Sequence, residues 1–146
     1  MQHVAILKKS WGMLPKILHG EKTIESRWYS AKLPPWDHIA VGEMVYFKNS
    51  GEPVSLKATV AKVVQFQDLT PQKIDAILEE YGSPIGIEDK ESFSQLVNKK
   101  KFCILVFLSD ALKIEPFEID KKGFGLMAAW LCVPDIQKIK RIRKAL

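Results

Sequence analysis

The 146-residue sequence lacks the features that define several large protein classes. It has only two cysteines, Cys103 and Cys132, and each lies in an apolar segment without a second cysteine at Cys-x-x-Cys spacing. We therefore expect buried free thiols and no disulfide framework. The three histidines, His3, His19 and His38, are scattered along the chain. None lies at a metal-ligand spacing, so we expect neither a metal site nor a cofactor.

Long hydrophobic runs are also missing. The longest, Phe102 to Leu108, is far shorter than the roughly 20 residues that a membrane-spanning helix needs. Met1 to Lys9 lacks the apolar centre of a signal peptide. The hydrophobic content of 47% is enough for one ordinary core. These features predict a soluble protein in the cytoplasm, with no membrane partner.

Net positive charge is small over most of the chain and is concentrated at its end. The formal net charge is +5, and residues 134–146 hold five of the 22 lysines and arginines against one acidic residue. Residues 1–133 are therefore close to neutral, which argues against a generally basic nucleic-acid coat. Any anion site in this part must be local. We expect residues 1–133 to form one domain, followed by a distinct C-terminal segment.

The C-terminal segment, residues 134–146, is predicted to form a basic amphipathic helix. At about 100° per residue, Ile139, Ile142 and Leu146 form a narrow apolar stripe with Ile136 at its margin, and basic residues cover the rest. Two interpretations stay open. In one, Lys140 and Arg141 contact phosphates and add affinity without sequence preference. In the other, the helix docks on the domain and its basic face is solvated.

Hydrophobic periodicity predicts five to seven strands and two or three helices. Strand patterns occur at residues 3–7, 41–48, 54–66, 102–108, 114–119 and 128–133, with a bulge or bend near residue 60. Helix patterns occur at residues 14–19 and 71–81, and a weaker one at residues 92–97. Thr70 suits the N-cap of the second helix, Pro71 its first turn and Gly82 its end.

A charged motif after the first predicted helix is the best indication of function. It consists of Gly20, Lys22, Glu25 and Arg27, and it is predicted to lie on a short strand. Successive side chains of a strand point to opposite faces, so Glu25 and Arg27 share one face and Ile24 lies on the other. If Ile24 packs in a core, the charged pair faces outwards. It is then either a solvated ion pair or part of a binding site.

The motif and the order of the elements resemble the ASCH domain, a member of the PUA-like superfamily, whose signature is Gly-x-Lys-x-x-Glu-x-Arg. The resemblance covers about Val4 to Val133 and includes a Val-Gly-Glu segment, a Leu-Thr-Pro helix and a late strand with Trp130. It implies an α+β fold. The expected architecture is a small PUA-like β-barrel of about five to seven mostly antiparallel strands with two or three flanking helices, followed here by the C-terminal basic helix.

The resemblance also implies a cleft between the first helix and the sheet that binds RNA, another single-stranded nucleic acid or a nucleotide-like small molecule. Arg27 offers a planar fork for phosphate or a base edge, and Lys22 offers a point charge. Glu25 offers an acceptor for an exocyclic amine, and Trp11 a surface on which a base can stack. The predicted binding residues are Lys22, Glu25, Arg27, Trp11, Lys9, Ser10, Lys140 and Arg141.

A hydrolase is the alternative function. Some small ASCH proteins remove the acetyl group from acetylated cytidine with a lysine, a threonine and a glutamate. The resemblance places the lysine at Lys22 and the glutamate near Glu79 or Glu80, but the threonine position holds Glu25, which cannot serve as a hydroxyl nucleophile. Lys22 and Glu25 would still perform acid–base or ribonuclease-type chemistry if burial shifted either pKa. We therefore expect a binding domain, with such a hydrolase as the alternative. A third class, a protein-interaction module that uses the basic tail, stays open.

Overall fold

The structure is a computed structural model, and it describes residues 1–141. Six strands form one mixed sheet in the order β2-β5-β4-β3-β1-β6. They are β1 (Gln2–Leu7), β2 (Ile24–Tyr29), β3 (Met44–Asn49), β4 (Val54–Phe66), β5 (Phe102–Phe117) and β6 (Trp130–Val133). The helices are α1 (Met13–Leu18), α2 (Pro71–Ile85) and α3 (Lys90–Leu96), with two short 3-10 helices, η1 (Lys9–Trp11) and η2 (Ile136–Lys138).

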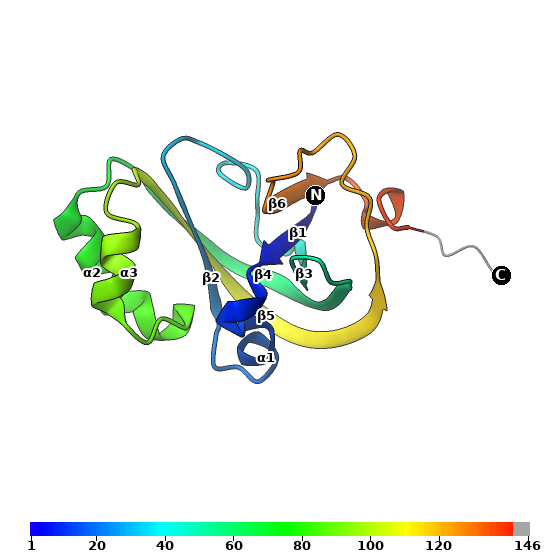
Figure 1. The fold of residues 1–146 in the computed structure, drawn as a ribbon, viewed down its shortest axis with the longest axis horizontal. Coiled ribbons are helices and arrows are strands. Elements are labelled where there is room, and N and C mark those ends of the chain that lie inside the picture. The colour runs from blue at the N-terminus through cyan, green and yellow to red at the C-terminus, as the bar shows by residue number, and fades with distance from the viewer. Residues whose placement is uncertain (142–146) are drawn as a thin grey trace.

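The sheet curls into a half-barrel, as Figure 1 shows for the long strands β4 and β5. β1 and β3 are parallel, whereas the other neighbouring strands are antiparallel. The pairing of β4 with β5 shifts register at three places, one of them between Val60 and Lys62. Such bulges bend a strand and increase its twist, which lets a small sheet close. The predicted α+β barrel-like fold and the bulge near residue 60 are confirmed.

Apolar side chains fill both faces of this curved sheet. The interior of the half-barrel holds a core that includes Ala5, Phe47, Ile104, Val106 and Trp130. The outer face of β2 and β5 packs against α2 and α3 through a second core that includes Ile24, Ile74, Leu78, Cys103 and Leu105. The second core therefore covers the side of β2 that faces away from the barrel.

Helix α2 begins as the sequence predicts and ends four residues later. The Thr70 side chain accepts a hydrogen bond of 3.2 Å from the Lys73 N–H, and Pro71 occupies the first turn. Gly82 lies inside the helix instead of ending it, and Gly86 forms the C-cap with a φ of 92°. Residues other than glycine rarely adopt this left-handed conformation, which explains why the helix ends there.

The last part of the chain differs from its prediction. The predicted amphipathic helix is not formed over residues 135–141, and the backbone instead makes the short η2 and a β-bridge between Lys140 and Ile119. Ile136 is buried and Ile139 packs beside it, so part of the apolar stripe does dock on the domain. Main-chain pairing with residues 118–120 replaces the helical hydrogen bonds. The rest of the predicted helix, residues 142–146, lies outside the described residues.

The two predicted strands at residues 102–108 and 114–119 are one strand, β5. Asp110, between them, has a φ of 53°, and the strand bends through register shifts without breaking its pairing with β4. Within residues 1–141, no helix is long and apolar enough to cross a bilayer.

Candidate binding site

Only Glu25 and Arg27 of the charged motif lie on β2, whereas Gly20 and Lys22 precede the strand that was predicted to carry all four, and both faces of β2 are covered. Glu25 pairs with Val106 and Arg27 with Ile104, and both partners belong to the core inside the half-barrel. Directly paired residues of antiparallel strands share a face, so Glu25 and Arg27 point into the barrel while Ile24 points toward α2. The prediction that the two charged residues share a face is confirmed. The prediction that they face solvent is wrong, because the curled sheet encloses the face opposite Ile24.

Lys22 precedes β2 and is a buried lysine, with 2% of its surface exposed. Its Nζ donates hydrogen bonds to the main-chain oxygens of Ile24, at 2.9 Å, and of Ile85, at 2.5 Å. Ile85 ends α2, where a cation interacts favourably with the helix dipole. Nζ also lies 3.6 Å from Glu25 Oε1. Burial lowers the pKa of Lys22, although the negative charge of Glu25 opposes this effect.

Glu25 is almost as deeply buried as Lys22, with 4% of its surface exposed. Its Oε1 accepts a hydrogen bond of 3.0 Å from the Ser26 N–H. Its Oε2 has no hydrogen-bond partner within residues 1–141, and Arg27 Nη2 lies 3.9 Å away. A buried carboxylate oxygen without a donor is costly, and such a group calls for an explanation.

Arg27 joins the two edges of the sheet. Its Nη1 donates to the Ala129 main-chain oxygen at 3.1 Å, and its Nη2 donates to the Ile6 main-chain oxygen at 3.3 Å. Ala129 directly precedes β6, and β2 and β6 are the two edge strands. The guanidinium carbon also lies 5.2 Å from the centre of the Trp130 ring. We call this arrangement of Arg27 with the two main-chain oxygens the Arg27 clasp.

Two aromatic residues next to the clasp were not predicted as site residues. Trp130 is buried inside the half-barrel beneath Arg27. Tyr29 follows Arg27 on the same face of β2, and its hydroxyl donates to the Pro34 main-chain oxygen at 3.0 Å. Burial raises the pKa of Tyr29, although the charge of Arg27 opposes this. Only the alternation along β2 could have indicated Tyr29 from the sequence.

A hollow of about 330 Å³ lies beside the motif, bounded by residues 17–20, residues 22–23 and residues 108–111. It lies between the end of α1 and the sheet, where the resemblance places a cleft. Gly20 and Lys22 belong to its lining, whereas Glu25 and Arg27 do not. Gly20 has a φ of 77° with open space around its Cα, so the turn requires glycine for its conformation and not for room.

The structure places the other predicted site residues on the surface. Lys9, Ser10 and Trp11 form η1, and 49% of the Trp11 surface is exposed. Lys9 pairs with Glu52 at 2.9 Å, also on the surface. None of these three residues lines the hollow beside Lys22. The exposed Trp11 ring is nevertheless available for stacking.

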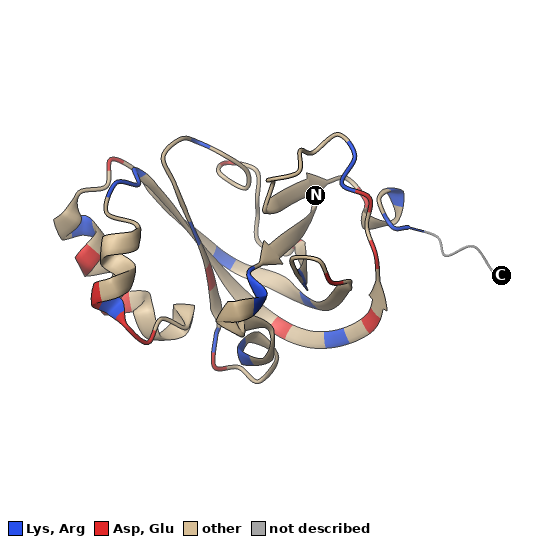
Figure 2. Cartoon of the chain, in the orientation of Figure 1, with Lys and Arg blue, Asp and Glu red and all other residues tan. Residues whose placement is uncertain are grey.

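Lys140 and Arg141 are exposed at the other end of the molecule from α2 and α3 (Figures 1 and 2). Lys140 Nζ lies 4.7 Å from the centre of the Phe117 ring. Main-chain hydrogen bonds join residues 118–120 to residues 139–141. Burial lowers the pKa of Lys48, and the charges of Lys121 and Arg141 lower it further, although the charge of Glu118 opposes them. Several cations therefore gather at this end of the sheet.

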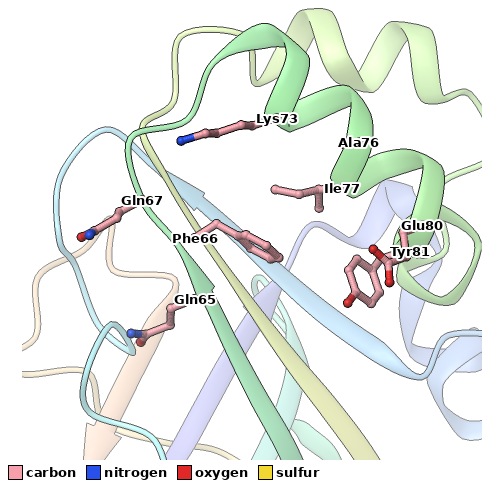
Figure 3. Close-up of a pocket in the computed structure, with 8 residues that line it drawn as sticks. All are labelled: Gln65, Phe66, Gln67, Lys73, Ala76, Ile77, Glu80 and Tyr81. Carbon is pink, nitrogen blue, oxygen red and sulfur yellow. The ribbon is translucent and has the colours of Figure 1, made fainter.

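A larger hollow, of about 420 Å³, lies between the end of β4 and α2 (Figure 3). Phe66, Ile77 and Tyr81 form its apolar part. Two of its polar side chains are engaged elsewhere, since Gln65 pairs with Asp37 and Lys73 donates to the Asp68 main-chain oxygen. The motif residues are absent from its lining, so we do not assign it the function of the motif.

No group of three or more His, Cys, Asp or Glu side chains within residues 1–141 is arranged to hold a metal ion. At the motif, the buried Lys22 and the partly buried Arg27 flank the buried Glu25 carboxylate, and Glu25 Oε2 has no hydrogen-bond partner within residues 1–141.

The chain is a half-barrel with Glu25 and Arg27 on its edge strand β2 and with α2 packed against the outer face of that strand. The crystal structure of the ASCH protein from Zymomonas mobilis has this fold, with a TM-score of 0.67 and 17% identity over 94% of this chain and 90% of that chain. A tyrosine-to-phenylalanine mutant of the same protein matches with a TM-score of 0.66 and 17% identity, over 94% of this chain and 93% of that one. A serine-to-alanine mutant matches with a TM-score of 0.66 and 18% identity, over 94% and 91%.

This chain therefore has the ASCH-domain fold, as its motif and element order predict. Neither a protein-family model nor a curated protein matches the chain.

Proposed function

We propose that the protein binds RNA or a nucleotide-like ligand and that Glu25 recognises an exocyclic amine of the base. The single observation that supports this most directly is the buried Oε2 of Glu25, which lacks a hydrogen-bond partner within residues 1–141. A carboxylate is an acceptor only, so it selects a donor from its ligand. The amino group of cytosine is a donor of this kind.

The surroundings of Glu25 support binding of a defined group at a fixed position. Lys22 and Arg27 hold the carboxylate from two sides, and both are anchored by main-chain oxygens. A rigid, buried acceptor loses little conformational entropy when a ligand binds. The Arg27 clasp lies at the seam between β2 and β6, where we place the entry of the base.

Surface residues would add the remaining contacts with a single strand. Trp11 provides an exposed aromatic ring on which a neighbouring base can stack. Lys140 and Arg141 provide phosphate contacts, which position a strand without reading its sequence. These roles extend the proposal from a nucleotide to an oligonucleotide.

A comparison of oligocytidylate with oligouridylate tests the role of Glu25. Cytosine carries an amine where uracil carries a carbonyl oxygen, so we expect the cytosine strand to bind roughly tenfold more tightly. Glu25→Gln replaces one acceptor oxygen with a donor and should abolish or invert this preference while the fold is retained. The measurement is a fluorescence titration at two salt concentrations. Equal affinity of the wild-type protein for both strands would exclude an amine at Glu25.

A hydrolase remains the second candidate because one specific observation favours it. Burial lowers the pKa of Lys22, which moves this amine toward a range useful for acid–base chemistry, and Glu25 lies beside it. However, main-chain oxygens already accept two of its ammonium protons. This candidate requires release of acetate from acetylated cytidine, or cleavage of RNA, that is lost in Lys22→Ala. No turnover with either substrate would exclude it.

A further inference from the structure

His3 is a buried histidine on β1, between Val45 of β3 and Cys132 of β6. Its Nε2 lies 2.8 Å from Glu43 Oε1, and its Nδ1 lies 3.0 Å from Trp130 Nε1, which donates to it. An indole nitrogen can only donate, so Nδ1 must be unprotonated and the imidazole proton lies on Nε2. The hydrogen-bond network therefore holds His3 as a neutral imidazole with its proton on Nε2.

Trp130 connects His3 to the charged motif. One edge of its indole is fixed by His3 Nδ1, and its ring lies 5.2 Å from the guanidinium carbon of Arg27. Arg27 in turn lies 3.9 Å from the free oxygen of Glu25. We propose that His3 is a positioning residue for the candidate site, and that protonation of His3 displaces Trp130 and loosens the Arg27 clasp. The consequence for ligand binding rests on the proposed function, whereas the movement of Trp130 does not.

The geometry gives the reason for this displacement. A proton from solvent that binds to Nδ1 places an N–H opposite the indole N–H at a distance of 3.0 Å. Two donors cannot share a hydrogen bond, so the indole has to turn away. The other neighbour of Nδ1 is Cys132 Sγ at 3.5 Å, and a thiol sulfur is only a weak acceptor. Glu43 keeps its hydrogen bond to Nε2 in both states, so the imidazole stays in place.

Burial and the groups around His3 determine the pH range in which His3 is protonated. Burial lowers the pKa of His3, although the hydrogen bond and the charge of Glu43 oppose this. Burial acts to raise the pKa of Glu43, but hydrogen bonds from His3, the Ala40 N–H and the Met1 amino group lower it overall. Burial raises the pKa of Cys132 to about 11, so this group remains a thiol. The pKa of His3 is therefore lower than that of an ordinary histidine, so the imidazole is neutral at pH 7 and takes up its proton only at more acidic pH.

The ligand-free protein provides the decisive measurement. The indole N–H resonance of Trp130, assigned by its loss in Trp130→Phe, is followed by NMR from pH 8 to pH 5 together with the Arg27 Nε–H resonance. We expect both to shift with one midpoint, below about 6.5, which matches the titration of the His3 imidazole. Neither should shift in this way in His3→Gln. His19→Gln and His38→Gln are matched controls, because both histidines are exposed, and they should keep the wild-type shifts.

A Trp130 resonance that stays constant while His3 titrates would overturn the proposal. A Trp130 shift whose midpoint differs from that of His3 would also overturn it. This comparison uses only the wild-type protein, so it can be made even if His3→Gln fails to fold. Affinity for oligocytidylate should fall roughly fivefold from pH 7.5 to pH 5.5 in the wild type, relative to His3→Gln. If the resonances shift but no oligonucleotide binds at any pH, the coupling of His3 to Trp130 and Arg27 is supported and the proposed function is wrong.

Discussion

The protein has two lysine–arginine pairs in opposite surroundings. The first pair is Lys22 and Arg27, and the second pair is Lys140 and Arg141. In the first pair Lys22 is buried and Arg27 is partly buried, and each donates two hydrogen bonds to main-chain oxygens. The second pair is exposed, and no side-chain hydrogen bond or ion pair joins it to another of residues 1–141. Each pair also places one cation against an aromatic ring, Trp130 or Phe117.

This difference in burial predicts different roles in ligand binding for the two pairs. Buried cations with assigned partners hold Glu25 in one position, which suits selection of a particular group on a ligand. Exposed cations are free to follow a phosphate backbone, and their contribution depends on salt. The two pairs should therefore respond differently to substitution. Substitution of Lys22 or Arg27 should mainly lower the free energy of unfolding, whereas substitution of Lys140 and Arg141 should change only the salt dependence of RNA binding.

The largest expected effect is that of Lys22→Met. This change keeps the bulk of the side chain but leaves the Glu25 carboxylate buried without its nearest cation, so we expect a loss of about 3–5 kcal/mol in the free energy of unfolding. Urea denaturation measures it. Lys9→Met, which breaks an exposed ion pair with Glu52, is the control and should not change the urea midpoint.

The double variant Lys22→Met, Glu25→Gln sharpens this test. Removal of both charges of a buried pair is often nearly neutral, because no uncompensated charge remains. The double variant should therefore recover most of the stability that Lys22→Met loses. If the two substitutions add their costs instead, the interaction between Lys22 and Glu25 is not what stabilises this part of the barrel.

A smaller effect is expected for Arg27→Lys. Lysine keeps the charge but cannot reach two carbonyl oxygens with a planar fork, so we expect a loss of about 1–2 kcal/mol. Hydrogen exchange should quicken at the Ile6 N–H, which donates to the same Ala129 main-chain oxygen that accepts from Arg27 Nη1. Arg141→Lys is the matched control and should leave this exchange rate unchanged. Equal protection in both variants would mean that the clasp does not close the barrel.

The two pairs also show what a sequence can and cannot predict. The strands, the bulge near residue 60 and the start of α2 follow from periodicity and capping, which are local properties of the chain. The motif residues were found because their spacing resembles that of a known domain. Their burial was not predictable, since it depends on the curl of the sheet and on β6, about 100 residues later in the chain. The role of Trp130 depends on the same long-range contact.

The prediction of a C-terminal helix was wrong over residues 135–141, although the periodicity on which it rested is present. The periodicity of Ile136 and Ile139 is real, and both residues pack on the domain. Residues 118–120 lie alongside and offer main-chain partners, so the segment pairs with them as a bridge instead of forming its own helical hydrogen bonds over residues 135–141. Short helices are marginal without tertiary support, and here tertiary contacts favour another backbone conformation.

The smallest effect on the protein itself is expected for the exposed pair. Lys140→Gln with Arg141→Gln should leave the urea midpoint unchanged, because neither side chain has a polar partner within residues 1–141. In a titration with single-stranded RNA at several salt concentrations, the slope of log affinity against log salt should become less steep by about 1.4, as expected for two lost phosphate contacts. Lys99→Gln with Lys101→Gln removes two exposed charges elsewhere and should keep the wild-type slope. If the slope is the same in both double variants, Lys140 and Arg141 do not contact the RNA backbone, and the RNA contacts lie near the motif. If substitution of Lys140 and Arg141 changes the base preference, the exposed pair also takes part in recognition.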